Sequence, residues 1–251
     1  MTDFAGKTAI VTGAARGLGR DYARLFARDG ANVVAADVNA EGANECAAEI
    51  GKADGRAIGV ALDVRDPASA KAAVDAALAR FGGADILVNN AAVWGDYESK
   101  SLLDVELEYW NLCLAVNLTG PLVCARAAIP AMQQKGWGRI INISSIGAWL
   151  PLSGVYGVSK LALHNVTMQL AALVGGSGIT VNAVAPGVIL NEATLKQAKR
   201  AQLDGMIAQS ATKRAGTSED LYGAIRWLAS DDAAWVTGQV ISPNGGFISR
   251  L

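Results

Sequence analysis

Tyr156 and Lys160 form a candidate acid/base pair, four residues apart in the segment YGVSK at 156–160. On a helix this spacing places a phenol and an ammonium group on one face, about one turn from each other. A neighbouring cation favours the phenolate form of a tyrosine, so such a pair can exchange a proton with a bound substrate. An amphipathic surface pair has the same spacing. Other residues of the chain must therefore decide whether the pair is catalytic.

The composition limits the classes of function. The chain has 251 residues, of which 51% are hydrophobic and 18% charged, and it contains 28 glycines. These values favour a well-buried sheet over disorder. A net charge of -1 gives no electrostatic reason to expect nucleic acid or an anionic membrane surface. We expect small-molecule chemistry.

Cysteine usage and the N-terminus indicate the compartment. Cys46, Cys113 and Cys124 show no CxxC spacing, so neither a disulfide framework nor a metal site is expected, and a reducing cytoplasm fits. We see no signal segment before the first apolar run and no later run near the ~20 apolar residues that span a bilayer. We expect a soluble, cytoplasmic protein that has no membrane partner.

Short apolar runs alternate with longer helical patterns along the whole chain. Runs that are apolar on both faces are typical of a parallel sheet with helices on each side. The pattern predicts an α/β fold, a Rossmann-type doubly wound parallel sheet of about seven strands in a single domain, 1–251. The polar, helix-prone segment 189–212 breaks the rhythm and is a candidate cover over a substrate site. The expected strands are 8–11, 32–36, 57–62, 86–88, 139–143, 179–184 and 239–242.

A glycine-rich turn, TGAARGLG at 12–19, follows the first expected strand directly. Glycine lets the backbone turn sharply and approach a pyrophosphate, whose charge then lies against the N–H groups at the start of the following helix. A tight connection without a ligand is the alternative. A strand before the turn and a helical pattern after it favour a dinucleotide site. Its expected members are Gly13, Arg16, Gly17, Leu18 and Gly19.

Asp37 closes the second expected strand, 18 residues after Gly19. A carboxylate there accepts hydrogen bonds from an adenosine ribose and repels a 2′-phosphate, which favours NAD over NADP. A solvated strand-end or capping residue is the alternative. Arg16 opposes the choice, because a guanidinium in the glycine turn can contact a 2′-phosphate. We expect NAD, because Asp37 would be buried against the ribose while Arg16 can swing to solvent.

The next two strand ends carry further candidates. Asp63 and Val64 follow the third expected strand, where a short polar side chain can meet an adenine edge, although capping the next helix is nearly as good an explanation. Asn90 and Ala91 follow the fourth, in the segment NNAA at 89–92. Loops at these ends should line the ligand crevice. Asparagine also forms turns.

Together these motifs resemble the short-chain dehydrogenase/reductase family over essentially the whole chain. The family pattern TGxxxGxG matches residues 12–19, NNAG matches 89–92 with Ala92 in place of the last glycine, and YxxxK matches Tyr156 and Lys160. The resemblance implies hydride transfer between a nicotinamide cofactor and a carbon that bears an oxygen.

The resemblance also implies roles for single residues. Tyr156 would be the general acid/base, Lys160 would assist it by charge and hold the nicotinamide ribose, and Asn117 would anchor a water of a proton relay. A serine would position the substrate oxygen, and Ser145 is expected because the second serine of the pair is the usual position. The family generally keeps a longer interval: Ser145 precedes Tyr156 by 11 residues and Ser144 by 12. Ser144 therefore stays open.

Two segments depart from the family pattern. The segment PGVI at 186–189 resembles the nicotinamide-side turn, and Pro186, Gly187 and Ile189 are expected at the cofactor. The family's threonine is replaced by Asn191, whose amide can still hydrogen-bond a carboxamide. Near the C-terminus, Asn244 stands where the family commonly has an acid before two glycines.

His164, the only histidine in the sequence, continues the series Tyr156, Lys160. After eight residues a helix has rotated about 80° past that face, so we expect His164 to pack or to contact a neighbouring subunit. A hydrophobic substrate pocket is expected from aromatic and apolar residues near strand ends, with core packing as an equal explanation. These are Trp94, Tyr97, Trp149, Leu150 and the cover from residue 189 onward.

The sequence thus predicts an oxidoreductase that transfers a hydride between NAD(H) and a small or medium hydrophobic secondary alcohol or ketone. An NADPH-dependent carbonyl or 3-oxoacyl reductase is the alternative. A dinucleotide-binding regulator without turnover is a third, which the presence of a whole proton relay argues against. We also expect a homo-oligomer, either a tetramer or a dimer, with apolar helices at 102–132 and 156–173 as suitable faces.

Overall fold

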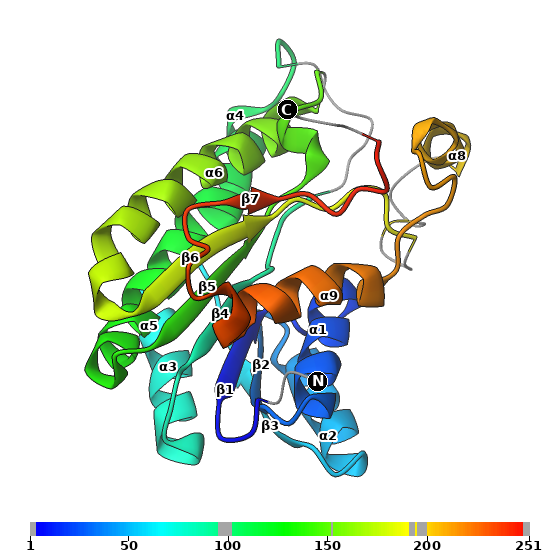
Figure 1. Cartoon of the computed structure of the whole chain (residues 1–251). Helices are drawn as coiled ribbons and strands as arrows, with labels where there is room; N and C mark the ends of the chain where they lie inside the picture. The colour runs from blue at the N-terminus through cyan, green and yellow to red at the C-terminus, as the bar shows by residue number, and fades with distance from the viewer. Residues whose placement is uncertain (1–3, 95–101, 152, 191–193, 195–199, 248–251) are drawn as a thin grey trace.

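The computed structural model describes residues 4–94, 102–151, 153–190, 194 and 200–247. Seven parallel strands form one sheet in the order β3-β2-β1-β4-β5-β6-β7 (Figure 1). The sheet confirms the predicted fold class and strand number, and every expected strand overlaps an observed one. The strands are β1 (Thr8–Thr12), β2 (Asn32–Asp37), β3 (Arg56–Ala61), β4 (Ile86–Asn89), β5 (Gly138–Ile143), β6 (Ile179–Val184) and β7 (Val240–Ile241).

Helices connect the strands and cover both faces of the sheet (Figure 1). Alternate residues of each strand point to opposite faces, so Ala9 and Val11 of β1 enter one apolar core while Ile10 enters the other. Helices α1, α2 and α9 pack on the first face, and α3, α5 and α6 on the second. Their bounds are α1 (Gly17–Arg28), α2 (Ala40–Lys52), α3 (Pro67–Phe81), α4 (Leu107–Leu114), α5 (Gly120–Lys135), α6 (Gly154–Val174), α8 (Arg200–Gln209) and α9 (Ser218–Ala229).

The strand order reverses between β1 and β4. From β1 the chain moves outward through β2 and β3, then returns to the other side of β1 and continues to β7. Loops that leave neighbouring strands in opposite directions open a crevice at the carboxyl ends of the strands, which is where ligands bind in such sheets. The glycine turn after β1, the asparagines after β4 and the serines after β5 all lie at this edge.

One helical run departs from the sequence expectation. Leu107–Lys135, which comprises α4, a π-helical turn (Ala115–Thr119) and α5, is long and apolar enough to cross a membrane by length and composition alone. The expectation that no such run exists was wrong. The helix α5 nevertheless packs on the sheet through Ala125, Ala128 and Met132, as a core helix does. The absence of a membrane partner stays a prediction.

Candidate active site

Tyr156 and Lys160 lie on the first two turns of α6, as their spacing predicts. Tyr156 is half-buried, whereas Lys160 is only 2% exposed. The Lys160 Nζ lies 5.6 Å from the centre of the Tyr156 ring and donates a hydrogen bond to the carbonyl of Ile143, at 2.7 Å. The amine is thus held between the end of β5 and the tyrosine, with no carboxylate among its hydrogen-bond partners in the described chain.

Burial lowers the pKa of Lys160 from its ordinary value of 10.5 to about 8. The cause is loss of solvation, because an ammonium buried without an anion loses hydration that protein groups only partly replace. The group therefore titrates close to neutral pH, which is suitable for a residue that assists proton transfer.

The lowered pKa of Lys160 predicts a pH-dependent stability. Between pH about 8 and about 10.5 the unfolded lysine holds a proton that the folded one has released, so unfolding free energy rises with pH in this window, by up to about 3 kcal/mol. Urea unfolding of the cofactor-free protein measures this change. Across the window, the unfolding free energy of wild type should rise by about that amount relative to the unfolding free energy of Lys160→Met. A constant difference would mean that Lys160 titrates normally.

The two serines after β5 point in different directions. Ser145 begins a 3₁₀ turn (Ile146–Ala148), and its Oγ accepts from the Gly147 N–H at 3.0 Å. A methyl group built on Gly147 would lie 3.3 Å from the Ser145 Oγ and 3.4 Å from Cε1 of Tyr156, so both groups border the same small space. Ser144 is 2% exposed and turns away toward His164. The geometry favours Ser145 over Ser144 as the serine that meets a substrate.

Asn117 is fully buried in the π-helical turn between α4 and α5. Its Oδ1 accepts from the N–H of Val93 at 2.8 Å, and its Nδ2 donates to the carbonyl of Val93 at 2.9 Å and to the Ser159 Oγ at 3.1 Å. Ser159 in turn donates to the carbonyl of Tyr156 at 2.7 Å. The side chain of Asn117 therefore ties the loop after β4 to the helix that carries Tyr156, in addition to the relay-water role that the family resemblance implies. That role stays a prediction.

Asn90 and Ala91 hold the glycine turn. The Asn90 Nδ2 donates to the carbonyls of Thr12 and Gly13 at 2.9 and 3.3 Å, and the N–H groups of Asn90 and Ala91 both donate to the Thr12 Oγ1 at 3.0 Å. A methyl group on Gly19 would lie 2.1 Å from the carbonyl oxygen of Gly13. Both asparagine and glycine are thus required by close packing of the turn.

The start of α1 fits an anionic ligand. Asn39, Asp66 and Thr217 cap α2, α3 and α9 with their side chains, whereas Arg16, at the same position of α1, makes no capping hydrogen bond and is exposed. Gly17 has a φ of +57°, and the space beside its Cα is open. N–H groups without a side-chain cap at the start of a helix are what a pyrophosphate requires. The residues present therefore fit a dinucleotide.

Alanine substitutions at Gly17 and Gly19 should cause different defects, the first in cofactor binding and the second in stability. In Gly17→Ala the methyl group enters open space, so the protein should fold with a cost of about 1–2 kcal/mol for the positive φ and lose cofactor affinity at least about tenfold. Gly19→Ala, in contrast, should lower the melting temperature strongly. Thermal unfolding and NADH fluorescence titration measure both effects. Normal NADH affinity in Gly17→Ala would exclude a pyrophosphate at this position.

Asp37 ends β2 beside the glycine turn. Its carboxylate accepts from the N–H of Ala15 at 3.0 Å and from the N–H of Asn39 at 2.9 Å. A half-buried Asp37 and an exposed Arg16 are the arrangement expected of a ribose-binding acid and a solvated guanidinium.

The candidates after β3 have clearer local roles. Asp63 forms an ion pair with Arg65 at 2.6 Å, and this partner holds the pKa of the Asp63 carboxyl below its ordinary value. Asp66 caps α3, so the capping alternative for Asp63 was wrong. Val64 is buried against Gly120 at the start of α5. An adenine contact by Asp63 or Val64 stays a prediction.

The nicotinamide-side turn is tied to its neighbours through the backbone. The carbonyl of Pro186 accepts from the N–H of Ile146 at 3.0 Å, and a Cβ on Gly187 would lie 2.7 Å from the Cα of Asn244. The side chain of Ile189 is 6% exposed and packs in the core, so a contact with the cofactor would have to come from its backbone. The expectations for Asn191 and Tyr97 lie outside the described residues.

The hydrogen bonds of Asn244 show why an amide can replace the family's acid near the C-terminus. Its Oδ1 accepts from the N–H groups of Gly246 and Phe247 at 2.8 and 3.1 Å, while its Nδ2 donates to the Ser242 Oγ at 3.1 Å. A carboxylate could accept the first two bonds but could not donate the third. An amide therefore suits this turn.

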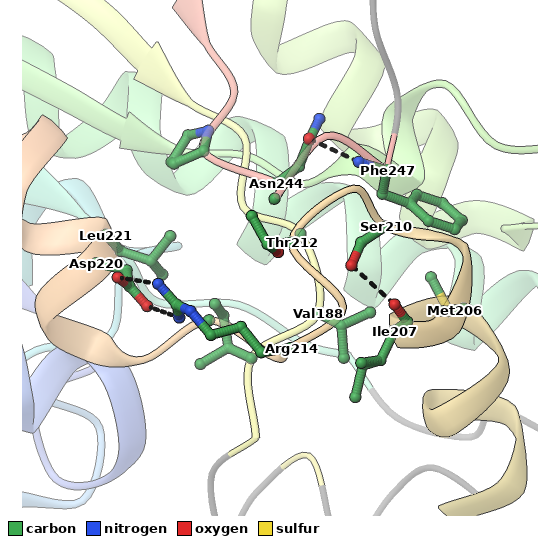
Figure 2. Close-up of a pocket in the computed structure, with 15 residues that line it drawn as sticks. Val188, Met206, Ile207, Ser210, Thr212, Arg214, Asp220, Leu221, Asn244 and Phe247 are labelled. Atoms are coloured by element: carbon green, nitrogen blue, oxygen red, sulfur yellow. Dashed lines mark hydrogen bonds and ion pairs between the residues drawn. The ribbon is translucent and has the colours of Figure 1, made fainter.

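A cavity of about 250 Å³ lies beneath the described part of the expected cover (Figure 2). The lining includes Val188 after β6, Met206 of α8 and Phe247 near the C-terminus, and Arg214 pairs with Asp220 at one side at 2.5 Å. Neither Tyr156 nor Ser145 lines it. The cavity is therefore distinct from these candidate catalytic groups, and a cover role for 189–212 stays a prediction.

Comparison with known proteins finds relatives along the whole chain. A family model described as Enoyl-(Acyl carrier protein) reductase matches residues 13–248. An uncharacterized oxidoreductase of Mycobacterium tuberculosis (strain CDC 1551 / Oshkosh) is 47% identical over 98% of this chain and 99% of its own. A 3-oxoacyl-[acyl-carrier-protein] reductase of Escherichia coli (strain K12) is 38% identical over 97% and 98%.

The fold has a close structural match as well. The crystal structure of a protein assigned as a short-chain alcohol dehydrogenase from Sinorhizobium meliloti 1021 has a TM-score of 0.92 and 34% identity over 100% of this chain and 99% of that one. The chain belongs to the short-chain dehydrogenase/reductase family. It is an oxidoreductase with a nicotinamide dinucleotide as cofactor and a small molecule as substrate.

Proposed function

We propose that the protein transfers a hydride between NAD(H) and a small or medium hydrophobic secondary alcohol or ketone, with Tyr156 as general acid/base. The observation that carries the proposal is the convergence of Tyr156 and the Ser145 Oγ on one small space, with the buried amine of Lys160 behind the tyrosine. When bound, the cofactor supplies or accepts the hydride.

The chain's own residues handle the proton and the oxygen. Tyr156 removes the alcohol proton on oxidation or donates it on reduction. The positive charge of Lys160 stabilises the phenolate, and its amine lies 5.6 Å from the centre of the tyrosine ring. Ser145 donates a hydrogen bond to the substrate oxygen, where negative charge develops.

The cofactor preference rests on Asp37. Its carboxylate borders the glycine turn at the end of β2, where it would meet the adenosine ribose and repel a 2′-phosphate. The second candidate is an NADPH-dependent 3-oxoacyl reductase. It is favoured by the exposed Arg16 in the same turn and by the relative of that name at 38% identity.

A panel of secondary alcohols and ketones, with ethyl acetoacetate as the 3-oxo ester, tests both candidates by absorbance of the reduced cofactor. The proposal expects turnover of several apolar members with NAD(H). Turnover only of the 3-oxo ester and only with NADPH would favour the second candidate. The absence of turnover with every member and both cofactors would contradict catalysis on this class of substrate.

The assembly and compartment are part of the proposal. Apolar side chains on α4 and α6 stay partly exposed, at 36–50%, which suits a contact between copies of the chain in a homo-oligomer. These are Leu112, Val158, Leu161 and Met168. Light scattering of the purified protein would show a dimer or tetramer; a monomer at micromolar concentration would contradict this. We expect a cytoplasmic location.

A further inference from the structure

His164 contacts the serine that precedes Ser145. It lies on α6, one turn after Lys160, and is 7% exposed. Its Nε2 is 2.7 Å from the Oγ of Ser144, and both side chains are buried. The rotation of the helix moves His164 away from the Tyr156 face, as expected, but that rotation directs its ring at the end of β5.

His164 also contacts the other end of the same turn. The ring of Trp149, which directly follows the 3₁₀ turn, packs against the imidazole with centroids 5.1 Å apart and planes at 45°. One imidazole therefore touches both Ser144 and Trp149, the residues on either side of Ser145 and its turn. The hydrogen bond is polar and the ring contact is apolar, so the two contacts can be separated by mutation.

The hydrogen bonds around Ser144 indicate the direction of donation. The Ser144 Oγ is also 3.3 Å from the carbonyl of Lys160, which can only accept. The arrangement that satisfies both contacts has the Ser144 hydroxyl donating to Lys160 and the His164 Nε2–H donating to Ser144. A side chain at 164 must then donate in order to keep the network.

Other bonds fix this segment to the sheet. The N–H of Ser144 donates to the carbonyl of Val184 at 2.7 Å, and the N–H of Ile146 donates to Pro186. These bonds connect the Ser145 turn with β6 and the segment after it, but they do not set its distance from α6, which carries Tyr156. Side chains of α6 make contacts to this segment. Lys160 donates a hydrogen bond to the carbonyl of Ile143, and His164 contacts Ser144 and the ring of Trp149.

We propose that His164 is a positioning residue that fixes the Ser145 turn at its working distance from Tyr156. This inference deepens the proposed function and rests on it. A shift of about 1 Å in a substrate-positioning group can reduce a rate about a hundredfold.

Three variants separate positioning from packing. Ser144→Ala removes the hydrogen bond with His164, together with the longer one to the Lys160 carbonyl, and leaves the packing of Trp149. His164→Leu removes the hydrogen bond with Ser144 but keeps the one from Ser144 to Lys160, and it also removes the contact of the imidazole with Trp149. His164→Gln keeps a donor near the position of Nε2. With ethyl acetoacetate and NADH as probe, we expect Ser144→Ala and His164→Leu to lower kcat about tenfold or more, and His164→Gln to recover most of it. The dissociation constant of NADH should stay within about twofold, since the side-chain contacts described above for Ser144 and His164 lie around the Ser145 turn and α6, away from the glycine turn.

Crystal structures of wild type and Ser144→Ala give a readout that needs no turnover. We expect the distance between the Ser145 Oγ and the Tyr156 hydroxyl to change by about 1 Å. An unmoved turn, or a kcat within twofold of wild type in both Ser144→Ala and His164→Leu, would overturn the inference. If wild type turns over no member of the panel, the proposed function fails, and the displacement of Ser145 alone then decides the role of His164.

Discussion

Tyr156→Phe is expected to lower kcat by about 10²–10⁴-fold while cofactor affinity stays nearly unchanged. The substitution removes the proton that the reaction requires and keeps the ring, which borders Ser145 and lies 5.6 Å from the Lys160 amine. Steady-state kinetics with the best ketone of the panel, together with fluorescence titration of NADH, measure the two quantities separately.

Val158→Ala is a matched control for Tyr156→Phe. Val158 lies on the same turn of α6 but is 37% exposed on its surface. The control should leave kcat within about twofold of wild type, because Val158 is proposed above to contact another copy of the chain rather than the substrate, and its truncation to alanine is small. Substantial turnover by Tyr156→Phe would mean that another acid carries the proton, and the proposed mechanism would then be wrong.

Asp37→Ala is expected to change the cofactor preference. Removing the carboxylate removes hydrogen bonds to the ribose and the repulsion of a 2′-phosphate, so the ratio of kcat/KM for NADPH over NADH should rise about a hundredfold. The carboxylate also accepts from Ala15 and Asn39, and its loss will loosen the turn. Parallel kinetics with the two cofactors measure the ratio.

Two controls isolate the charge of Asp37. Asp37→Asn keeps one acceptor oxygen for the turn while removing the charge, and should move the ratio in the same direction. Asp63→Ala removes the carboxylate at the next strand end, which is already paired with Arg65, and should leave the ratio unchanged. A wild type that prefers NADPH, and loses that preference in Arg16→Ala, would contradict the NAD assignment.

Much of the fold could be predicted because its signals are local. Apolar runs bounded by turns predict buried parallel strands, and each of the seven expected ranges overlaps a strand of the sheet. The spacing of Tyr156 and Lys160 on one helix face and the glycines after β1 are likewise properties of neighbouring residues. An apolar helix was expected at 102–132, but not its length, because Leu107–Lys135 joins α4 and α5 through a π-helical turn, a feature without a clear signal in the sequence.

The roles of polar side chains were harder to predict, because their partners lie far along the chain. Asn90 bonds to Thr12, 78 residues away, and the side chain of Asn117 bonds to Val93 and Ser159. A sequence marks such residues as polar but not as donors to a particular carbonyl. The cap of α3 was hard to predict as well, because Asp63 and Asp66 are both acids near the start of the helix. The structure shows that Asp66 is the cap.

The sequence by itself determined the strand pattern and predicted a dinucleotide turn and an acid/base pair, because each follows from periodicity or from spacing within one element. Only the tertiary structure decided that Ser145 faces Tyr156 while Ser144 faces His164. Those directions depend on where the end of β5 meets α6. His164 lies eight residues after Tyr156 on α6, so the turn of the helix points its side chain away from the face of Tyr156 and Lys160. The same turn of the helix places its ring against Ser144.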